Sequence, residues 1–268
     1  MDIATLQAFE TEITKHVPKF KIAFKDEATL MKFLGFFAVA FNPRFMTAFT
    51  TTLGSTVYFP SKASYEAQPK SSFTILAHEF VHMKDSERYP GWYHLSYIFP
   101  QGLSPLVLAA YAAFVMKGWI PVVILALGVV LGCLAARKSA ALLVIIAVVA
   151  CVVSALAAIL LTGWWSTLFF GGVALLAPLP SPWRVKWELR GYTMSLAVLA
   201  WTYGSAAGLI RDMTARHFYG PDYYFMSWTK ATITAQLDHA ILQAQDGTLQ
   251  KDPVFAVVHS FLATRDAF

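Results

Sequence analysis

The chain has 268 residues, of which 57% are hydrophobic and 14% are charged. Soluble domains carry about 25% charged residues, so this composition argues against an ordinary soluble protein and favours one that meets lipid. The net charge of +5 does not indicate a nucleic-acid partner, because the basic residues are spread along the chain without a basic run or a nucleic-acid motif.

The N-terminal segment predicts a helix, a strand and a second helix. Residues 2–17 place apolar side chains at helical spacing, and residues 20–25 alternate apolar and polar side chains as a strand does. Asp26 can cap the next helix, which Pro43 ends.

A strand and a long helix follow in the prediction. Residues 55–60 predict a strand at the edge of a sheet, where it could pair with an extended peptide. After a polar segment, Ser71 or Ser72 can cap a helix over residues 72–88.

That helix carries the most informative motif of the chain. His78, Glu79 and His82 form an H-E-x-x-H sequence. On a helix, positions i and i+4 lie on the same face, so both imidazoles can bind one zinc ion. Glu79 then lies beside the metal, where it can act as the general base that takes a proton from a zinc-bound water.

A nearly uncharged stretch occupies the middle of the chain. Between residues 101 and 182 the only charged residues are Lys117, Arg137 and Lys138. A helix needs about 20 apolar residues to cross a bilayer. The stretch divides into four apolar segments that predict transmembrane helices: approximately 103–116, 119–136, 139–161 and 164–180. Because the first and the last are short, two crossings with two partly inserted helices are the alternative.

The two histidines leave one ligand position to fill, because a catalytic zinc site usually has three protein ligands. Glu188 begins a predicted helix after the apolar block, and without that block it would follow His82 after a short gap. We therefore predict Glu188 as the third ligand, with the nearby His94 as the alternative. The apolar block is then an insertion that leaves and returns on the same side of a membrane.

Charge placement favours four crossings over two. With four, Arg137 and Lys138 lie on the same side as the metal site, and Lys117 alone lies on the opposite side. Positive charge collects on the cytoplasmic face of membrane proteins. The sequence therefore predicts a cytoplasmic catalytic domain.

Beyond the block, the sequence predicts helices up to about residue 214, at 228–245 and at 253–263, with an aromatic-rich turn near 218–225.

A hydrolytic site also needs a proton donor that stabilises the oxyanion of the reaction. His217 is the first candidate for this catalytic role, and the alternatives are Tyr192, Tyr219 and Tyr223. Asp85 could orient an imidazole ligand by accepting a hydrogen bond from its other ring nitrogen, or it could be an ordinary surface charge.

The order of these features resembles the gluzincin-type metallopeptidases embedded in membranes, such as the CAAX prenyl-protein endopeptidases and the related heat-shock membrane proteases. The resemblance rests on the HEFVH sequence, the apolar block and the segment from Glu188 to Tyr192. Tyr192 stands where that family usually has Asp. The resemblance implies an α+β zincin-like metalloprotease domain split by an inserted transmembrane helical block, and mostly helical overall. It also implies a zinc ion held by His78, His82 and Glu188, with Glu79 as the base.

The sequence thus predicts three parts: a zincin-like half at 1–100, a transmembrane block of four helices at 101–182 and a helical half at 183–268. The predicted function is that of an integral-membrane, multi-pass zinc metalloendopeptidase. Its expected partners are the lipid bilayer and membrane-associated or cytoplasmic polypeptides, and its oligomeric state is not indicated. One alternative is a zincin-like membrane scaffold without catalysis. Another is a transporter or channel, which is disfavoured because residues 101–182 contain no acidic residue and no histidine.

Overall fold

The computed structural model describes residues 1–38, 44–100, 103–115, 166–175, 180–204, 207–220, 226–227 and 229–265. The chain divides into two compact units. The first unit consists of Met1–Ala28, Phe49–Tyr97 and Pro180–Phe268, and the second of Thr29–Ala48 and Ile98–Leu179.

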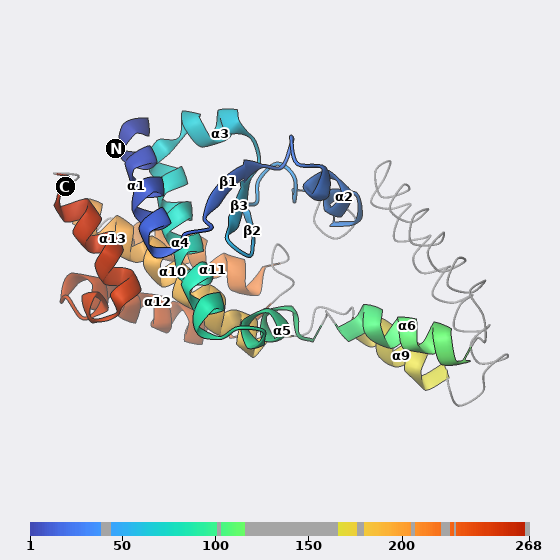
Figure 1. Cartoon of the computed structure of the whole chain (residues 1–268). Coiled ribbons are helices and arrows are strands. Elements are labelled where there is room, and N and C mark those ends of the chain that lie inside the picture. The colour runs from blue at the N-terminus through green and yellow to red at the C-terminus, as the bar shows by residue number, and fades with distance from the viewer. Residues whose placement is uncertain are drawn as a thin grey trace. The chain divides into compact units, whose positions relative to one another are not determined.

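The first unit is built mainly of helices, which are drawn in Figure 1. They are α1 (Ile3–His16), α3 (Lys62–Ala67), α4 (Pro69–Arg88), α5 (Trp92–Ile98), α10 (Pro182–Tyr203), α11 (Ala207–Tyr219), α12 (Lys230–Gln245), the short 3-10 helix η5 (Leu249–Lys251) and α13 (Pro253–Ala263). Helices α1, α12 and α13 confirm the predictions at 2–17, 228–245 and 253–263. The helix expected up to residue 214 is instead two helices, because the backbone at Gly204 takes a positive φ of 59° and ends α10.

Helix α4 begins earlier than its predicted serine cap. Pro69 is its first residue, a position where the missing N–H of proline costs no helical hydrogen bond. Ser72 lies inside the helix, and its hydroxyl donates to the carbonyl oxygen of Tyr65 at 2.8 Å. The polar segment before it also forms the short helix α3, which Ser61 caps.

A small three-stranded sheet belongs to the same unit. It consists of β1 (Lys21–Phe24), β2 (Thr51–Leu53) and β3 (Thr56–Phe59) in the order β1-β3-β2. Strand β3 pairs in parallel with β1 and antiparallel with β2, so it is the central strand. The prediction that residues 55–60 form the edge strand is therefore wrong. The sequence pattern missed β2, which takes that place.

The core of the first unit joins segments that are far apart in the sequence. Figure 1 shows α1 alongside α4. The rings of Phe9 and Phe73 lie 4.3 Å apart between these helices, and Phe261 of α13 packs 5.0 Å from Phe9. Helices α1 and α13 therefore fix the position of α4, the helix that carries the H-E-x-x-H motif.

The second unit contains α2 (Thr29–Ala38), α6 (Ser104–Val115) and α9 (Ser166–Ala174). Helices α6 and α9 lie side by side (Figure 1). The hydroxyl of Ser104 donates to the carbonyl oxygen of Gly172 at 2.6 Å, and the rings of Tyr111 and Phe169 lie 5.6 Å apart. A Cβ atom at Gly172 would lie 2.7 Å from Leu108, so this glycine permits the close approach of the two helices.

The prediction of an α+β zincin-like domain split by a transmembrane block is wrong. The described residues form a mostly helical structure with one small sheet, and none of their helices is both long and apolar enough to cross a membrane. Helix α6 has 12 residues and α9 has 9, which correspond to about 18 and 14 Å at 1.5 Å per residue, against a hydrocarbon core of about 30 Å. The predicted spans at 119–136 and 139–161 lie outside the described residues. The multi-pass location and the cytoplasmic orientation, which rested on the spans, are corrected with them.

Candidate metal centre

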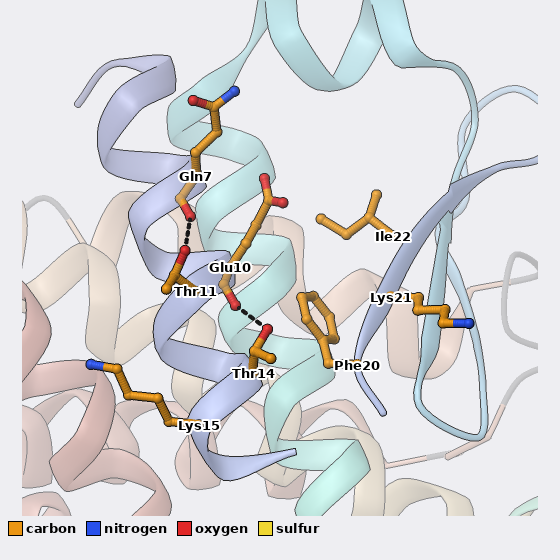
Figure 2. Close-up of a pocket in the computed structure, with 8 residues that line it drawn as sticks. All are labelled: Gln7, Glu10, Thr11, Thr14, Lys15, Phe20, Lys21 and Ile22. Atoms are coloured by element: carbon orange, nitrogen blue, oxygen red, sulfur yellow. Dashed lines mark hydrogen bonds between the residues drawn. The ribbon is translucent and has the colours of Figure 1, made fainter. Parts of the chain in front are cut away.

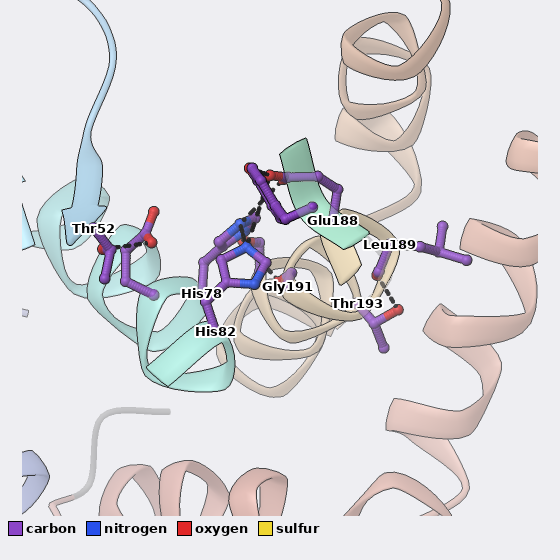
Figure 3. Close-up of polar contacts among 10 residues, drawn as sticks. Thr52, His78, His82, Glu188, Leu189, Gly191 and Thr193 are labelled. Carbon is purple, nitrogen blue, oxygen red and sulfur yellow. Dashed lines mark hydrogen bonds and ion pairs between the residues drawn. The ribbon is translucent and has the colours of Figure 1, made fainter. Parts of the chain in front are cut away.

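Two helices of the first unit bring His78, His82 and Glu188 together. The histidines lie one turn apart on α4, and Glu188 lies in the second turn of α10, the helix packed against it. In Figure 3 both imidazoles point toward the Glu188 carboxylate. The Nε2 atoms of the histidines are 2.9 Å apart, and Glu188 Oε2 is 3.5 Å from Nε2 of His78. The three residues are between 2% and 8% exposed, so the cluster is buried.

Ser195 of α10 can favour the tautomer of His78 that a metal ligand needs. The Ser195 hydroxyl lies 3.5 Å from the Gly191 carbonyl oxygen, to which it donates, and its oxygen lies 3.3 Å from Nδ1 of His78. While its hydroxyl donates to Gly191, the Ser195 oxygen can accept a hydrogen bond from Nδ1 of His78. With the proton on Nδ1, the lone pair of Nε2 is directed at His82 and Glu188, as a metal ligand requires.

Gly191 lets α10 approach the His78 ring closely. A Cβ atom at this position would lie 2.6 Å from Nε2 and 2.7 Å from Cε1 of His78. Because glycine has no Cβ, the backbone of α10 can pass this close to the His78 ring at position 191. The same helix turn also presents Tyr192, whose ring contacts His78 edge-on at 4.7 Å.

The two oxygens of Glu188 have different surroundings. The Tyr97 hydroxyl of α5 donates to Oε1. Oε2 is buried and has no hydrogen-bond partner among the described residues. A buried carboxylate oxygen without a partner is costly, so Oε2 is the atom of this cluster that most clearly calls for a cation.

The ionisation of the cluster follows from its burial and its contacts. Burial lowers the pKa of His78, but the Glu188 carboxylate 3.5 Å away and the negative charge of Glu79 outweigh it and raise the pKa overall. Burial and the neighbouring His78 lower the pKa of His82. Burial raises the pKa of Glu188, but its contacts with the two histidines outweigh burial, so the pKa is lowered overall. The carboxylate is therefore ionised and His82 is neutral at pH 7, the forms that bind a metal, whereas the raised pKa of His78 favours its protonated form, so a metal would bind there with release of a proton.

The residues present fit a zinc ion. Two imidazoles and one carboxylate form the His₂Glu set of catalytic zinc sites. With zinc–ligand bonds of about 2.0–2.2 Å, the ligand atoms of a tetrahedral site lie about 3.4 Å apart. The ligand atoms of the three residues all lie within 4.8 Å of one another. Their lone pairs and the negative charge of Glu188 converge from two helices, which a shared cation would stabilise.

Glu79 is held by the sheet rather than by α10. The hydroxyl of Thr52 in β2 donates to its Oε2 at 2.7 Å, on the side of α4 where Figure 3 shows Thr52. Lys25, directly after β1, is fully buried. Burial lowers the pKa of Lys25 to about 8, although the negative charge of Glu79 opposes this shift. The edge strand β2 thus holds Glu79, the predicted base, through Thr52. The negative charge of Glu79 also acts on the buried Lys25.

The other predicted site residues lie at different distances from the cluster. His217 stacks on Tyr192 with ring centroids 5.4 Å apart, so one aromatic ring separates it from His78. Tyr219 packs under Lys230, 5.8 Å from its Nζ, and Tyr223 lies outside the described residues. His94, the alternative ligand, faces the Ser86 hydroxyl at 3.0 Å and is not part of the cluster.

Asp85 pairs with a cation rather than with an imidazole. Its Oδ1 lies 3.4 Å from Nη1 of Arg190, and Nη2 of the same guanidinium donates to Asp252 at 2.8 Å. Asp252 also caps α13 by accepting the N–H of Val254 at 2.9 Å. This ion-pair network, Asp85–Arg190–Asp252, ties α4, α10 and the start of α13 together one turn beyond the ligands.

Sequence reasoning missed several residues of the site, and for two of them a signal was present. Gly191 and Ser195 follow Glu188 at i+3 and i+7, so they lie on the same face of a helix as the predicted ligand. Tyr97 and Thr52 carry no such signal, because they reach the site from α5 and β2 through tertiary packing.

A shallow hollow elsewhere in the first unit does not belong to the metal centre. It lies between α1 and β1, and Figure 2 shows its eight lining residues, among them Glu10, Thr11 and Thr14. The two threonine hydroxyls donate to backbone carbonyls of α1 itself, at 3.1 and 2.9 Å. None of the predicted site residues lines this hollow.

Comparison with known proteins gives no relative. No family model, no curated protein and no solved structure matches the chain. The resemblance to membrane-embedded gluzincins therefore stays a prediction from the motifs.

Proposed function

We propose that this protein is a zinc metalloendopeptidase whose metal is held by His78, His82 and Glu188. The convergence of these three buried side chains from α4 and α10 is the observation that carries the proposal. Structural zinc sites usually have four protein ligands, whereas catalytic sites have three and keep one position open. Three ligands next to a glutamate in the motif therefore favour catalysis over a structural role.

The chemistry divides between the ion and the chain. A bound zinc ion would polarise a peptide carbonyl and lower the pKa of a coordinated water toward about 7. Glu79 would accept the proton of the attacking water on its carboxylate and deliver it to the leaving amine. The Thr52 hydroxyl, which donates to Glu79 Oε2, would hold the carboxylate in one orientation during both transfers.

The donor that stabilises the oxyanion would come from α10 or α11. Tyr192 contacts the His78 ring at 4.7 Å, and His217 stacks on Tyr192. Tyr192 is therefore nearer to the cluster than His217, and we place it ahead of His217 for this role. The substrate would be a polypeptide in extended form beside β2, which in the described part of the chain pairs only with β3.

Replacing Glu79 by Gln tests the proposal. Glutamine keeps the size of the side chain and a hydrogen bond with Thr52, but it cannot accept the proton. Cleavage of a mixture of quenched fluorescent peptides by the zinc-loaded chain is expected to fall by about 10²- to 10⁴-fold, while zinc content stays at the wild-type level. Glu87→Gln is the matched control, because Glu87 is an exposed glutamate on the same helix. It should leave cleavage unchanged.

Two outcomes would contradict the proposal. Undiminished cleavage by the Glu79→Gln variant would show that another group is the base. Zinc binding by the wild-type chain without cleavage of any peptide would favour the alternative of a zincin-like protein that binds without catalysis.

A further inference from the structure

Tyr97 is the one described residue outside α4 and α10 that hydrogen-bonds a member of the ligand cluster. Its hydroxyl donates to Glu188 Oε1, and its ring lies edge-on to His82 with centroids 6.2 Å apart. No sequence pattern assigned it a role. Its position in the short helix α5 therefore needs an explanation of its own.

Helix α10 itself fixes the position of Tyr97. The Nε atom of Arg184 donates to the Tyr97 carbonyl oxygen at 2.9 Å, and the guanidinium lies over the Tyr97 ring at 5.5 Å. Arg184 lies one turn before Glu188 on the same face of α10. In addition, the indole N–H of Trp187 donates to the Ser96 hydroxyl at 3.0 Å. The segment that carries the hydroxyl and the segment that carries the carboxylate are thus locked to each other.

This arrangement makes the two oxygens of Glu188 unequal. Oε1 accepts a hydrogen bond from the Tyr97 hydroxyl and lies 3.9 Å from Nε2 of His82. Oε2 has no hydrogen-bond partner in the described structure and lies 3.5 Å from Nε2 of His78. The oxygen left to face a cation is therefore Oε2.

We propose that Tyr97 is a positioning residue that restricts Glu188 to one ligating oxygen, Oε2. The inference rests on the proposed zinc site. A carboxylate can bind a metal through one oxygen or through both, and two-oxygen binding beside two histidines and a water would raise the coordination number from four to five. By engaging Oε1, Tyr97 keeps the site four-coordinate, so that a substrate carbonyl can still join the water at the metal.

Cobalt(II) substituted for zinc reports the number of ligands directly, because four-coordinate Co(II) absorbs visible light more strongly than five-coordinate Co(II). The wild-type chain loaded with Co(II) should show the intense four-coordinate bands. The Tyr97→Phe variant keeps the ring but frees Oε1, so its bands should lose intensity and take the five-coordinate pattern. Tyr93→Phe is the matched control: it removes a hydroxyl one turn earlier on α5 and should keep the wild-type spectrum.

The possible results distinguish failure of the proposed role of Tyr97 from failure of the proposed zinc site. If the Co(II)-loaded wild-type chain already showed the weak five-coordinate bands, the proposed role of Tyr97 would be overturned. A Tyr97→Phe spectrum identical to that of the wild type would also overturn it, while the zinc site and the proposed function stand. Failure of the wild-type chain to bind Co(II) at all would overturn the proposed function and the inference with it.

Discussion

At the residue scale, Gly191 shows how closely α10 must pass over the ligand ring. The three nearest atoms that a Cβ atom would meet here all belong to the His78 imidazole. That ring has little room to move, because Tyr192 and His82 each contact it with centroids 4.7 Å away. A single methyl group at position 191 therefore acts on the metal ligand rather than on the general packing of the helix.

Replacing Gly191 by Ala should weaken zinc binding by about 10- to 100-fold, the range typical of losing a group that orients a ligand. Competition with a chromogenic chelator measures this change. Alanine in place of glycine normally stabilises a helix by about 1 kcal/mol, so Gly171→Ala in α9 is the control: its Cβ would meet no atom within 4 Å. Equal zinc affinities for Gly191→Ala and the wild type would show that the His78 ring is not confined as described.

Single residues also show what the sequence could and could not predict about the site. The spacing of His78 and His82 follows from helix geometry alone, and the structure brings Glu188 to them as expected. The zinc ion itself and the catalytic role of Glu79 stay predictions. Thr52 and Tyr97 could not be foreseen, because their hydrogen bonds depend on where β2 and α5 pack and not on any local pattern.

At the scale of elements, the pairing of α4 with α10 creates the site, and the Asp85–Arg190–Asp252 network supports it. Asp85 is 1% exposed, and one of its oxygens has no hydrogen-bond partner among the described residues. Burial raises the pKa of Asp85 to about 6, although the positive charge of Arg190 opposes the shift. Helices α4 and α10 are therefore joined through the Asp85 carboxylate, whose ionised form is disfavoured by burial.

This cost predicts a specific dependence of stability on pH. Between the ordinary value of 3.8 and about 6, the folded protein keeps the Asp85 proton more strongly than the unfolded chain does. The contribution of Asp85 to the free energy of unfolding should therefore fall as pH rises from about 4 to 6 and stay low above that range. Relative to the Asp85→Asn variant, the metal-free wild type should lose stability across this window in urea titrations.

The matched control for this experiment is Asp212→Asn, which removes an exposed carboxylate from α11. Its unfolding free energy should run parallel to that of the wild type between pH 4 and 6. If the Asp85→Asn curve also ran parallel to the wild type, Asp85 would not hold its proton in the folded state.

Local patterns predicted elements well where side-chain periodicity decides the structure. The helices at α1, α12 and α13 and the strand at β1 are of this kind. Strand β2 was missed because its three residues are too few for a period-2 pattern, and its place at the sheet edge depends on pairing with β3. The start of α4 was misplaced because proline at the first position outweighed the nearby serines.

At the scale of the whole molecule, the residues of the candidate site all belong to the first compact unit. The chain enters this unit in three separate segments, and the second unit takes residues 29–48 and 98–179. The sequence therefore indicated correctly that Glu188 lies near His82 in space despite their separation. The prediction that the intervening block consists of membrane-crossing helices is not supported, because no helix among the described residues is both long and apolar enough to cross a membrane. Helices α6 and α9 are too short for a crossing.

Zinc stoichiometry and affinity, measured by mass spectrometry of the bound metal and by chelator competition, test the metal centre most directly. The wild-type chain should bind one zinc ion. Loss of a residue that only orients a metal ligand weakens metal binding by about 10- to 100-fold. Glu188→Ala removes a ligand itself, so it should weaken zinc binding by more than this. His94→Ala, which removes a histidine outside the cluster, should bind zinc as the wild type does. A wild-type chain that binds no zinc, or a Glu188→Ala variant with wild-type affinity, would contradict a site built from His78, His82 and Glu188.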